Sequence, residues 1–73
     1  MFDCESAKSI KVGDMLCVDN LWNRTEPKHK LTIPTEILGT KNAQCQTGVL
    51  LLVRCISGME RWLSAGWFHK QKG

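Results

Sequence analysis

The segment Gly48–Ile56, with the sequence GVLLLVRCI, constrains the fold of this chain more than any other. Its leucine and β-branched residues occupy both sets of alternating positions, which predicts a central strand buried on both faces. The next segment, Ser57–Glu60, contains a glycine that can adopt a positive φ and is typical of a tight turn. Arg61–Ser64 is expected to return antiparallel. The main predicted element is therefore a β-hairpin over Gly48–Ser64.

Two further strands are predicted upstream of this hairpin. A Gly-Asp turn at residues 13–14 leads into Met15–Leu21, where apolar residues follow. Within Val12–Val18, apolar residues occupy both sets of alternating positions, which suits a strand covered on both sides. Leu31–Leu38 alternates apolar and polar residues, the period-two pattern of a half-buried strand. Pro34 has no N–H to donate, so this strand is expected at a sheet edge or with a bulge.

The segments between these strands are polar. Trp22–Lys30 is predicted to be a long loop and Gly39–Thr47 a polar connection. Residues 1–9 form a polar lead-in, and residues 69–73 form a basic tail.

The segment after Ser64 has two interpretations. A return strand can end in a single turn over Ala65–Phe68. Alternatively, apolar residues between Met59 and Trp67 also fall at helical spacing, which indicates a short helix. Gly66 disfavours that helix by about 1 kcal/mol relative to alanine. A strand followed by a turn is therefore the favoured interpretation.

The chain of 73 residues is expected to form a single domain over residues 1–73, mainly β, with four or five short strands. The order of a Val-Gly-Asp strand, a long polar loop, a second strand, the GVLLLVR hairpin and a terminal turn resembles SH3-like domains over residues 10–68. The resemblance implies a small β-barrel. The acidic loop and aromatic pair that hold proline-rich peptides in eukaryotic SH3 domains have no counterpart here, and the chain contains no Tyr. The chain also resembles in type the small accessory proteins of bacteriophages.

Charge is distributed unevenly along the chain. The net charge of +3 is made up of −2 over residues 1–21, +2 over residues 22–53 and +3 over residues 54–73. A basic half can attract a polyanion such as a nucleic acid. The start of the chain lacks the pattern of a signal peptide, and no apolar run is long enough to cross a bilayer. We therefore expect a cytoplasmic protein that does not associate with membranes.

The four cysteines are expected to be reduced in that compartment. Cys17 and Cys55 lie in apolar stretches and are predicted to be small core residues, whereas Cys4 and Cys45 are predicted to lie at the surface or in loops. Their spacing lacks the close pairs of a zinc site, so no metal is expected. No nucleophile motif, carboxylate pair or phosphate-binding glycine loop occurs. An enzyme and a cofactor are therefore not expected.

Two clusters of basic and aromatic residues are the candidate binding sites, one in the polar loop and one near the C-terminus. Rings can fill pockets of a protein partner or stack on bases, and cations can contact acidic side chains or phosphates. The alternatives are a solvated loop for the first cluster and core packing for the tryptophans of the second. Trp22 in particular is expected to be partly exposed. The candidate partner-binding residues are Trp22, Arg24, Lys28, His29, Lys30, Arg61, Trp62, Trp67 and Lys70.

These observations favour a non-enzymatic binding module, such as a small regulatory or phage-encoded inhibitor that binds a host or cognate protein. The alternative is a small-barrel protein that binds DNA or RNA. A homodimer through an exposed strand edge is also open, because a small core gains from burying more apolar surface.

Overall fold

The predicted hairpin is present in the computed structural model, which describes residues 2–44 and 46–70. It consists of β4, Val49–Arg54, and β5, Glu60–Ser64, paired antiparallel so that Leu52 lies opposite Trp62. Gly58 has a φ of +94° in the connecting turn. Only a residue without Cβ adopts this conformation without strain, so the turn prediction is confirmed.

The strand β4 is central in its sheet, as predicted, because it pairs with β5 on one side and with β3, Gly39–Asn42, on the other. Burial along β4 alternates. Val49, Leu51 and Val53 are buried, whereas Leu50 and Leu52 are only half-buried. The expectation that both faces are fully buried was therefore wrong. One face packs into the core, and the other is partly open to solvent.

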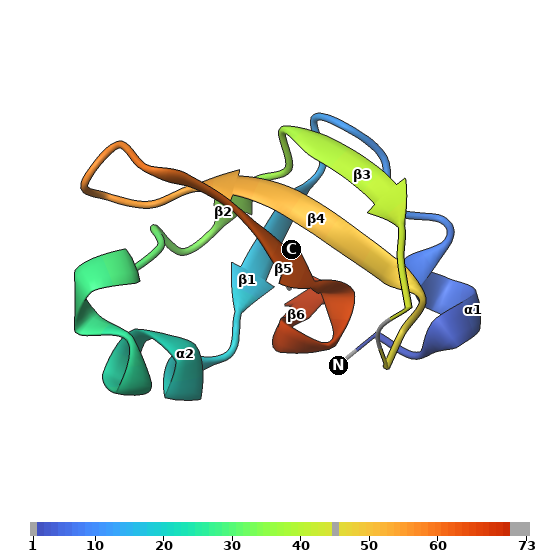
Figure 1. The fold of residues 1–73 in the computed structure, drawn as a ribbon, viewed down its shortest axis with the longest axis horizontal. Helices are drawn as coiled ribbons and strands as arrows, with labels where there is room; N and C mark the ends of the chain where they lie inside the picture. Colours follow the sequence, from blue (N-terminus) through green and yellow to red (C-terminus); the bar gives the residue numbers. More distant parts are fainter. Residues whose placement is uncertain (1, 45, 71–73) are drawn as a thin grey trace.

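A second sheet has the order β2–β1–β6 and is also antiparallel. These strands are β1, Met15–Val18, β2, Thr35–Glu36, and β6, Phe68–Lys70. The strands β2 and β3 follow each other closely, so the chain passes directly from one sheet to the other (Figure 1). Apolar residues of both sheets join one core that includes Leu16, Val18, Leu51, Val53 and Phe68. The structure is thus mainly β with two small antiparallel sheets, and the described strands form no closed barrel.

Two short helices occupy segments that were predicted as strand and loop. The strand predicted over Met15–Leu21 ends at Val18, and the loop predicted over Trp22–Lys30 instead contains most of α2, Asn20–Thr25, and the 3-10 helix η1, Pro27–His29. The side chain of Asp19 accepts a hydrogen bond from the N–H of Leu21 and caps α2. The cap ends the strand and turns the chain into the helix.

The strand predicted over Leu31–Leu38 is reduced to β2 at Thr35–Glu36. Pro34 precedes β2 and has no N–H for a ladder, which agrees with the expected interruption and edge position. The polar connection predicted over Gly39–Thr47 contains β3, so that part of the prediction was wrong. Polar residues tolerate this position because β3 is an edge strand that is largely exposed.

The ends of the described chain contain more structure than was expected. The lead-in contains α1, Cys4–Ala7, and places Phe2 and Ala7 in the core, where Ile10 joins them directly after it. After β5 the chain forms a 3-10 turn, η2, at Ala65–Trp67, and then β6. The turn was predicted and the helix over Met59–Trp67 was wrong, whereas β6 was not foreseen. Part of the predicted basic tail, residues 71–73, lies outside the described residues.

Candidate functional site

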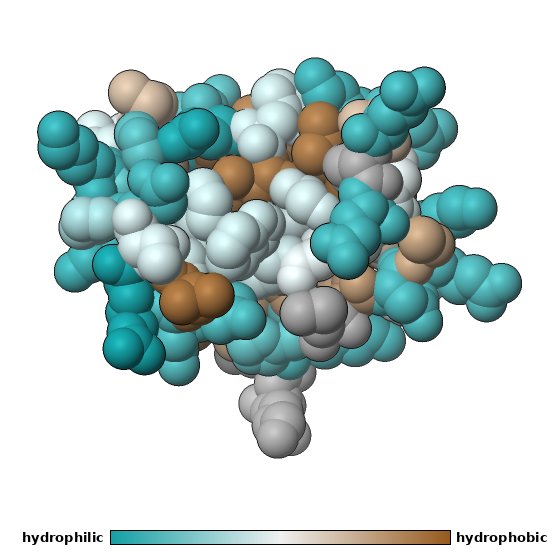
Figure 2. Space-filling view, turned by 60° about the horizontal axis from the view of Figure 1, so that its bottom comes forward, coloured by the Kyte–Doolittle hydropathy of each residue, from teal (hydrophilic) through white to brown (hydrophobic). Residues whose placement is uncertain are grey.

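A groove of about 700 Å³ lies between segments that are far apart in the sequence. Its walls come from the N-terminal segment, the start of α2, the connection between β3 and β4, and the end of β5 with η2. These elements meet on the underside of the view in Figure 1, which Figure 2 brings forward. Pale and brown side chains gather on that face, with hydrophilic ones around them (Figure 2). The groove is lined by Phe2, Asp3, Cys4, Asp19, Leu21, Gln46, Thr47, Ser64, Gly66 and Trp67.

The start of α2 is fixed to η2 at the floor of the groove. The N–H of Asp19 donates to the carbonyl oxygen of Trp67 at 2.7 Å. One turn further along α2, the rings of Trp22 and Trp67 meet edge to face with centroids 5.1 Å apart. The side chain of Leu21 is left 51% exposed at the rim. This wall of the groove therefore combines the ring of Trp67, which packs against Trp22, with the exposed aliphatic side chain of Leu21.

The middle of α2 is held by three further hydrogen bonds from the side chains of Trp22 and Asn23. The indole Nε1 of Trp22 donates to the carbonyl oxygen of His29 at 3.0 Å. Asn23 accepts from the N–H of Leu31 at 2.9 Å and donates to its carbonyl oxygen at 3.2 Å. These bonds tie the helix to the segment that returns toward β2. The groove wall formed by α2 is thus part of the packed domain.

The opposite wall depends on Asp3 and Ser6, which cap α1 reciprocally. Asp3 Oδ1 accepts from the backbone N–H and from the hydroxyl of Ser6, both at 2.8 Å. The backbone hydrogen bond, followed by the hydroxyl bond, lowers the pKa of Asp3 below its ordinary value of 3.8. Cys4 Sγ contacts the carbonyl oxygen of Gln46 at 3.3 Å and joins this wall to the connection between β3 and β4.

The base of the groove beside β5 is formed by small residues. Ser64 Oγ accepts from the N–H of Gly66 at 3.2 Å and lies 3.3 Å from Thr47 Oγ1. A Cβ on Gly66 would lie 3.5 Å from Ser64 Oγ and Thr47 Cγ2. This part of the groove is therefore formed by short side chains and a glycine. Chemically, the groove offers apolar surface from Phe2, Leu21 and Trp67 together with the carboxylates of Asp3 and Asp19.

Only one of the predicted binding residues, Trp67, lines this groove. Trp22 was expected to be partly exposed, but it is only 6% exposed, because its ring packs in the core and its Nε1 is bonded. Lys70, in β6, lies opposite Leu16 of β1 and lines a separate hollow of about 410 Å³. The basic residues Arg24, Lys28 and Lys30 are exposed on the α2–η1 segment, and His29 is half-buried there.

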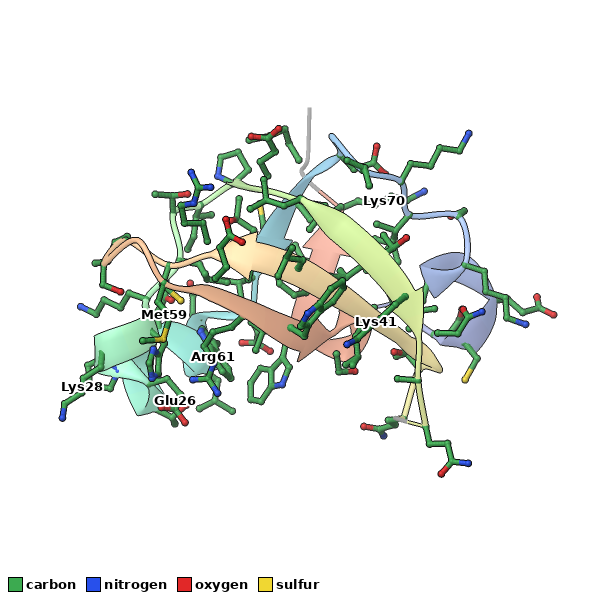
Figure 3. All side chains as sticks on the ribbon, turned by 45° about the horizontal axis from the view of Figure 1, so that its top comes forward. Glu26, Lys28, Lys41, Met59, Arg61 and Lys70 are labelled. Carbon is green, nitrogen blue, oxygen red and sulfur yellow. The ribbon has the colours of Figure 1, made fainter. Side chains whose placement is uncertain are left out.

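Trp62 and Arg61 lie on opposite faces of β5. Trp62 is 38% exposed on the outer face, with Lys41 Nζ 4.3 Å from its ring centroid. Its ring reaches across Leu52 toward Gly39, where a Cβ would lie 3.4 Å from the ring edge. Arg61 is half-buried on the inner side, and Figure 3 draws it near Met59. The structure therefore places the residues of the predicted C-terminal cluster on different surfaces.

Sequence reasoning missed Asp19, Leu21, Phe2 and Asp3 as lining residues. A signal existed for two of them. Asp19 stands two residues before the apolar pair Leu21 and Trp22, which is a position typical of a helix N-cap. Asp3 and Ser6 have the spacing of a capping box. No local signal marks Phe2 or Leu21, because only the tertiary arrangement brings them together.

The prediction for the cysteines holds for two of the three that are described. Cys55 is 3% exposed and belongs to the core, and Cys4 is exposed, whereas Cys17, which was predicted as a core residue, is only half-buried. Burial raises the pKa of Cys55 above 9.0, and the nearby positive charge of Arg61 opposes this effect. Cys45 lies outside the described residues.

Within the part of the chain that the structure describes, no group of three or more His, Cys, Asp or Glu side chains could hold a metal ion. No helix in residues 2–44 and 46–70 has both the length and the apolar character that crossing a bilayer requires. Comparison of the chain with protein-family models, curated proteins and solved structures found no match.

Proposed function

We propose that this chain is a non-enzymatic binding module whose groove holds a short segment of a partner protein. The observation that carries the proposal is the half-exposed Leu21 beside the ring of Trp67 in a groove of about 700 Å³. This volume lies within the range of about 300–1,000 Å³ that is usual for ligand sites. An apolar residue of the partner would fill the space between Leu21, Trp67 and Phe2, and burying it would supply the main free energy of binding.

Charge indicates what the partner segment carries beside its apolar residue. Asp3 and Asp19 both line the groove, and the described lining residues include no Lys or Arg to neutralise them. The two carboxylates lie at the starts of α1 and α2, where backbone N–H groups hold them in place. We therefore infer that the segment carries a Lys or Arg next to its apolar residue.

The finer fold that we propose for these strands is an SH3-like barrel. Its support is the passage from β2 to β3 between two three-stranded sheets and the 3-10 turn η2 between β5 and β6. A regulatory role, in which a cytoplasmic, phage-encoded protein occupies a site on a host protein, is compatible with a small domain that presents a groove of this size. The exposed free thiol of Cys4 is compatible with a reducing compartment.

DNA or RNA binding is the second candidate, because Arg24, Lys28 and Lys30 are all exposed on one segment. The support from stacking is weaker than the sequence suggested. Trp22 is buried, and Lys41 lies over the ring of Trp62. Binding of a 20-nucleotide single strand that weakens steeply with salt and is lost when these three cations are replaced by Gln would favour this candidate over ours.

The proposal is tested by selecting a displayed library of random dodecapeptides against the protein. Leu21→Gln removes apolar surface from the groove, whereas Val12→Gln removes it from a residue that is 65% exposed and does not line the groove. We expect enriched peptides to combine an apolar residue with Lys or Arg and to bind Val12→Gln but not Leu21→Gln. A selection that yields only peptides bound equally by both variants, or no enriched peptide, would overturn the proposal.

A further inference from the structure

The strand β5 presents an unpaired edge. Cys55 donates its N–H to the carbonyl oxygen of Met59 at 2.7 Å, which starts the ladder between β4 and β5. Alternate pairs of an antiparallel ladder exchange hydrogen bonds, so Arg61 and Leu63 bond to β4. Consistent with this alternation, the carbonyl oxygen of Leu52, opposite Trp62, accepts from Leu38 on the other side.

The backbone groups of Glu60, Trp62 and Ser64 therefore face away from β4. Within residues 2–44 and 46–70, no strand pairs with this edge, and no backbone hydrogen bond outside the helices and strands engages the groups of Glu60 and Trp62. At the end of β5, the carbonyl oxygen of Ser64 instead begins the 3-10 turn η2. In Figure 1 β5 lies at the front of its sheet, with its free side toward α2. Such an edge can pair with another chain.

The other described edges are less suited to accept a strand. The edge strands β2 and β6 have two and three residues, and β3 contains Gly39 and Lys41. Lysine and short length are common protections of an edge. The five residues of β5 include the exposed ring of Trp62, which gives an added strand an apolar neighbour on the outer face.

Arg61 is a half-buried cation for which no ion pair or hydrogen bond is found in the described part of the chain. Figure 3 draws Glu26 in the same region, but no ion pair joins its carboxylate to Arg61. Arg54, in contrast, is paired with Glu60 at 2.7 Å. An added strand would place alternate side chains beside Arg61 on the inner face, where a carboxylate would find an unused partner.

The edge and the groove are continuous at Ser64, which is the last residue of β5 and also lines the groove. A strand rises about 3.3 Å per residue, so a single extended segment of roughly eight residues can follow β5 and enter the groove. We infer that the partner segment of the proposed function pairs with the β5 edge as an added strand and places a carboxylate against Arg61. Its basic and apolar residues then occupy the groove. This inference rests on the proposed function.

A second copy of this chain fits the edge less well. If two β5 strands pair antiparallel about a two-fold axis at Trp62, the two Trp62 residues lie opposite each other. Arg61 of one copy then lies opposite Leu63 of the other. The cation then meets no carboxylate. An extended segment of a different protein that carries one carboxylate beside Arg61 satisfies both the backbone edge and this cation.

The test uses peptides selected for binding to the intact wild-type protein. Arg61→Gln should weaken those that carry Asp or Glu roughly fivefold or more, whereas Lys28→Gln, which removes an exposed cation from η1, should change affinity less than twofold. Replacing the peptide carboxylate by its amide should remove the difference between wild type and Arg61→Gln. Alternate N–H groups of an added strand point toward β5, and the others point away from it. N-methylation of the first set should therefore abolish binding, whereas N-methylation of the second set should not. This measurement does not depend on a protein variant.

Hydrogen exchange provides the direct readout, because the amide protons of Trp62 and Ser64 should become protected when the peptide binds. If these amides stay unprotected, and Arg61→Gln and N-methylation leave affinity unchanged while Leu21→Gln weakens it, the added strand is wrong and the groove stands. If Leu21→Gln has no effect either, both proposals fail. Protection of the two amides by self-association without peptide would also overturn the added strand, in favour of a homodimer.

Discussion

The rings of Trp22 and Trp67 meet edge to face, with centroids 5.1 Å apart and planes inclined by 69°. This contact joins α2 to η2, two elements on the same side of the groove. It also explains why two residues from different predicted clusters have different roles. Trp22 is buried and supports the wall, whereas Trp67 remains half-buried and forms part of the surface of the groove.

Replacing Trp22 should cost far more stability than replacing Trp62. Trp22→Ala removes a buried ring and its bond to His29, so we expect a loss of about 3–5 kcal/mol in the free energy of unfolding. Trp62→Ala removes a ring that is 38% exposed and should cost about 1 kcal/mol. Urea unfolding of both variants measures this difference, and equal losses would contradict the assigned burial.

The two hydrogen bonds between the Asn23 side chain and the backbone of Leu31 should stabilise the fold by joining α2 to the following segment. Asn23→Ala leaves both the N–H and the carbonyl oxygen of Leu31 without their described partners, which should cost about 1–3 kcal/mol. Asn20→Ala is the matched control, because Asn20 is exposed and its side chain makes no described hydrogen bond; its cost should stay within about 0.5 kcal/mol. Thermal unfolding that ranks the two variants equally would show that these two hydrogen bonds do not contribute.

Gly58 should resist substitution because of its backbone conformation. Its φ of +94° is strained for any residue with a Cβ, so Gly58→Ala should destabilise the hairpin by about 1–2 kcal/mol. Gly66→Ala is the control: its φ is not positive, and its new Cβ would make contacts of 3.5 Å. We expect a change within about 0.5 kcal/mol for the control. A tolerated Gly58→Ala would mean that the turn differs in solution.

The thiol of Cys55 should make stability depend on alkaline pH. Burial raises its pKa above 9.0, so the folded state favours the neutral thiol, and the unfolded chain loses the proton first. The resulting stability is fully present below about pH 9 and is lost as pH rises through the folded pKa. Unfolding measured across this range should show a weaker pH dependence in Cys55→Ala and an unchanged one in Cys4→Ala. Equal slopes in all three proteins would contradict the burial of this thiol.

The hairpin was predictable because β4 and β5 are determined by local pattern. An apolar run, a glycine turn and a return segment leave few alternatives. The helices α1 and α2 were missed because four and six residues are too few to show helical periodicity. Their signal is in the caps, Asp3 and Asp19, whose side chains bond backbone N–H groups that only a helix presents.

The groove could not be predicted from the sequence because its lining is assembled from four separate segments. Trp22 and Trp62 have similar polar neighbourhoods in sequence, yet one is buried and the other lies on the outer face of a sheet. Their burial depends on tertiary packing, which composition does not encode. The predicted basic residues therefore lie on surfaces other than the groove, which is lined by Asp3 and Asp19.

The acidic ends of the groove should determine which peptides bind. Asp19→Asn keeps a good N-cap for α2 and removes the charge, so the fold should be retained. We expect peptides with Lys or Arg to bind this variant roughly fivefold more weakly, while variants of those peptides with Gln at the basic position lose nothing further. Glu36→Gln, on β2 and outside the groove, is the control for net charge. Equal weakening by both substitutions would show a general effect of charge.

The binding of a single peptide distinguishes the groove beside Leu21 from the rest of the surface. The affinity of one selected peptide is measured by titration calorimetry for the wild type, Leu21→Gln and Val12→Gln. Losing the apolar contact of Leu21 should weaken binding by about tenfold, whereas Val12→Gln should leave it unchanged. Equal affinity for Leu21→Gln and the wild type, with both variants folded, would contradict the account.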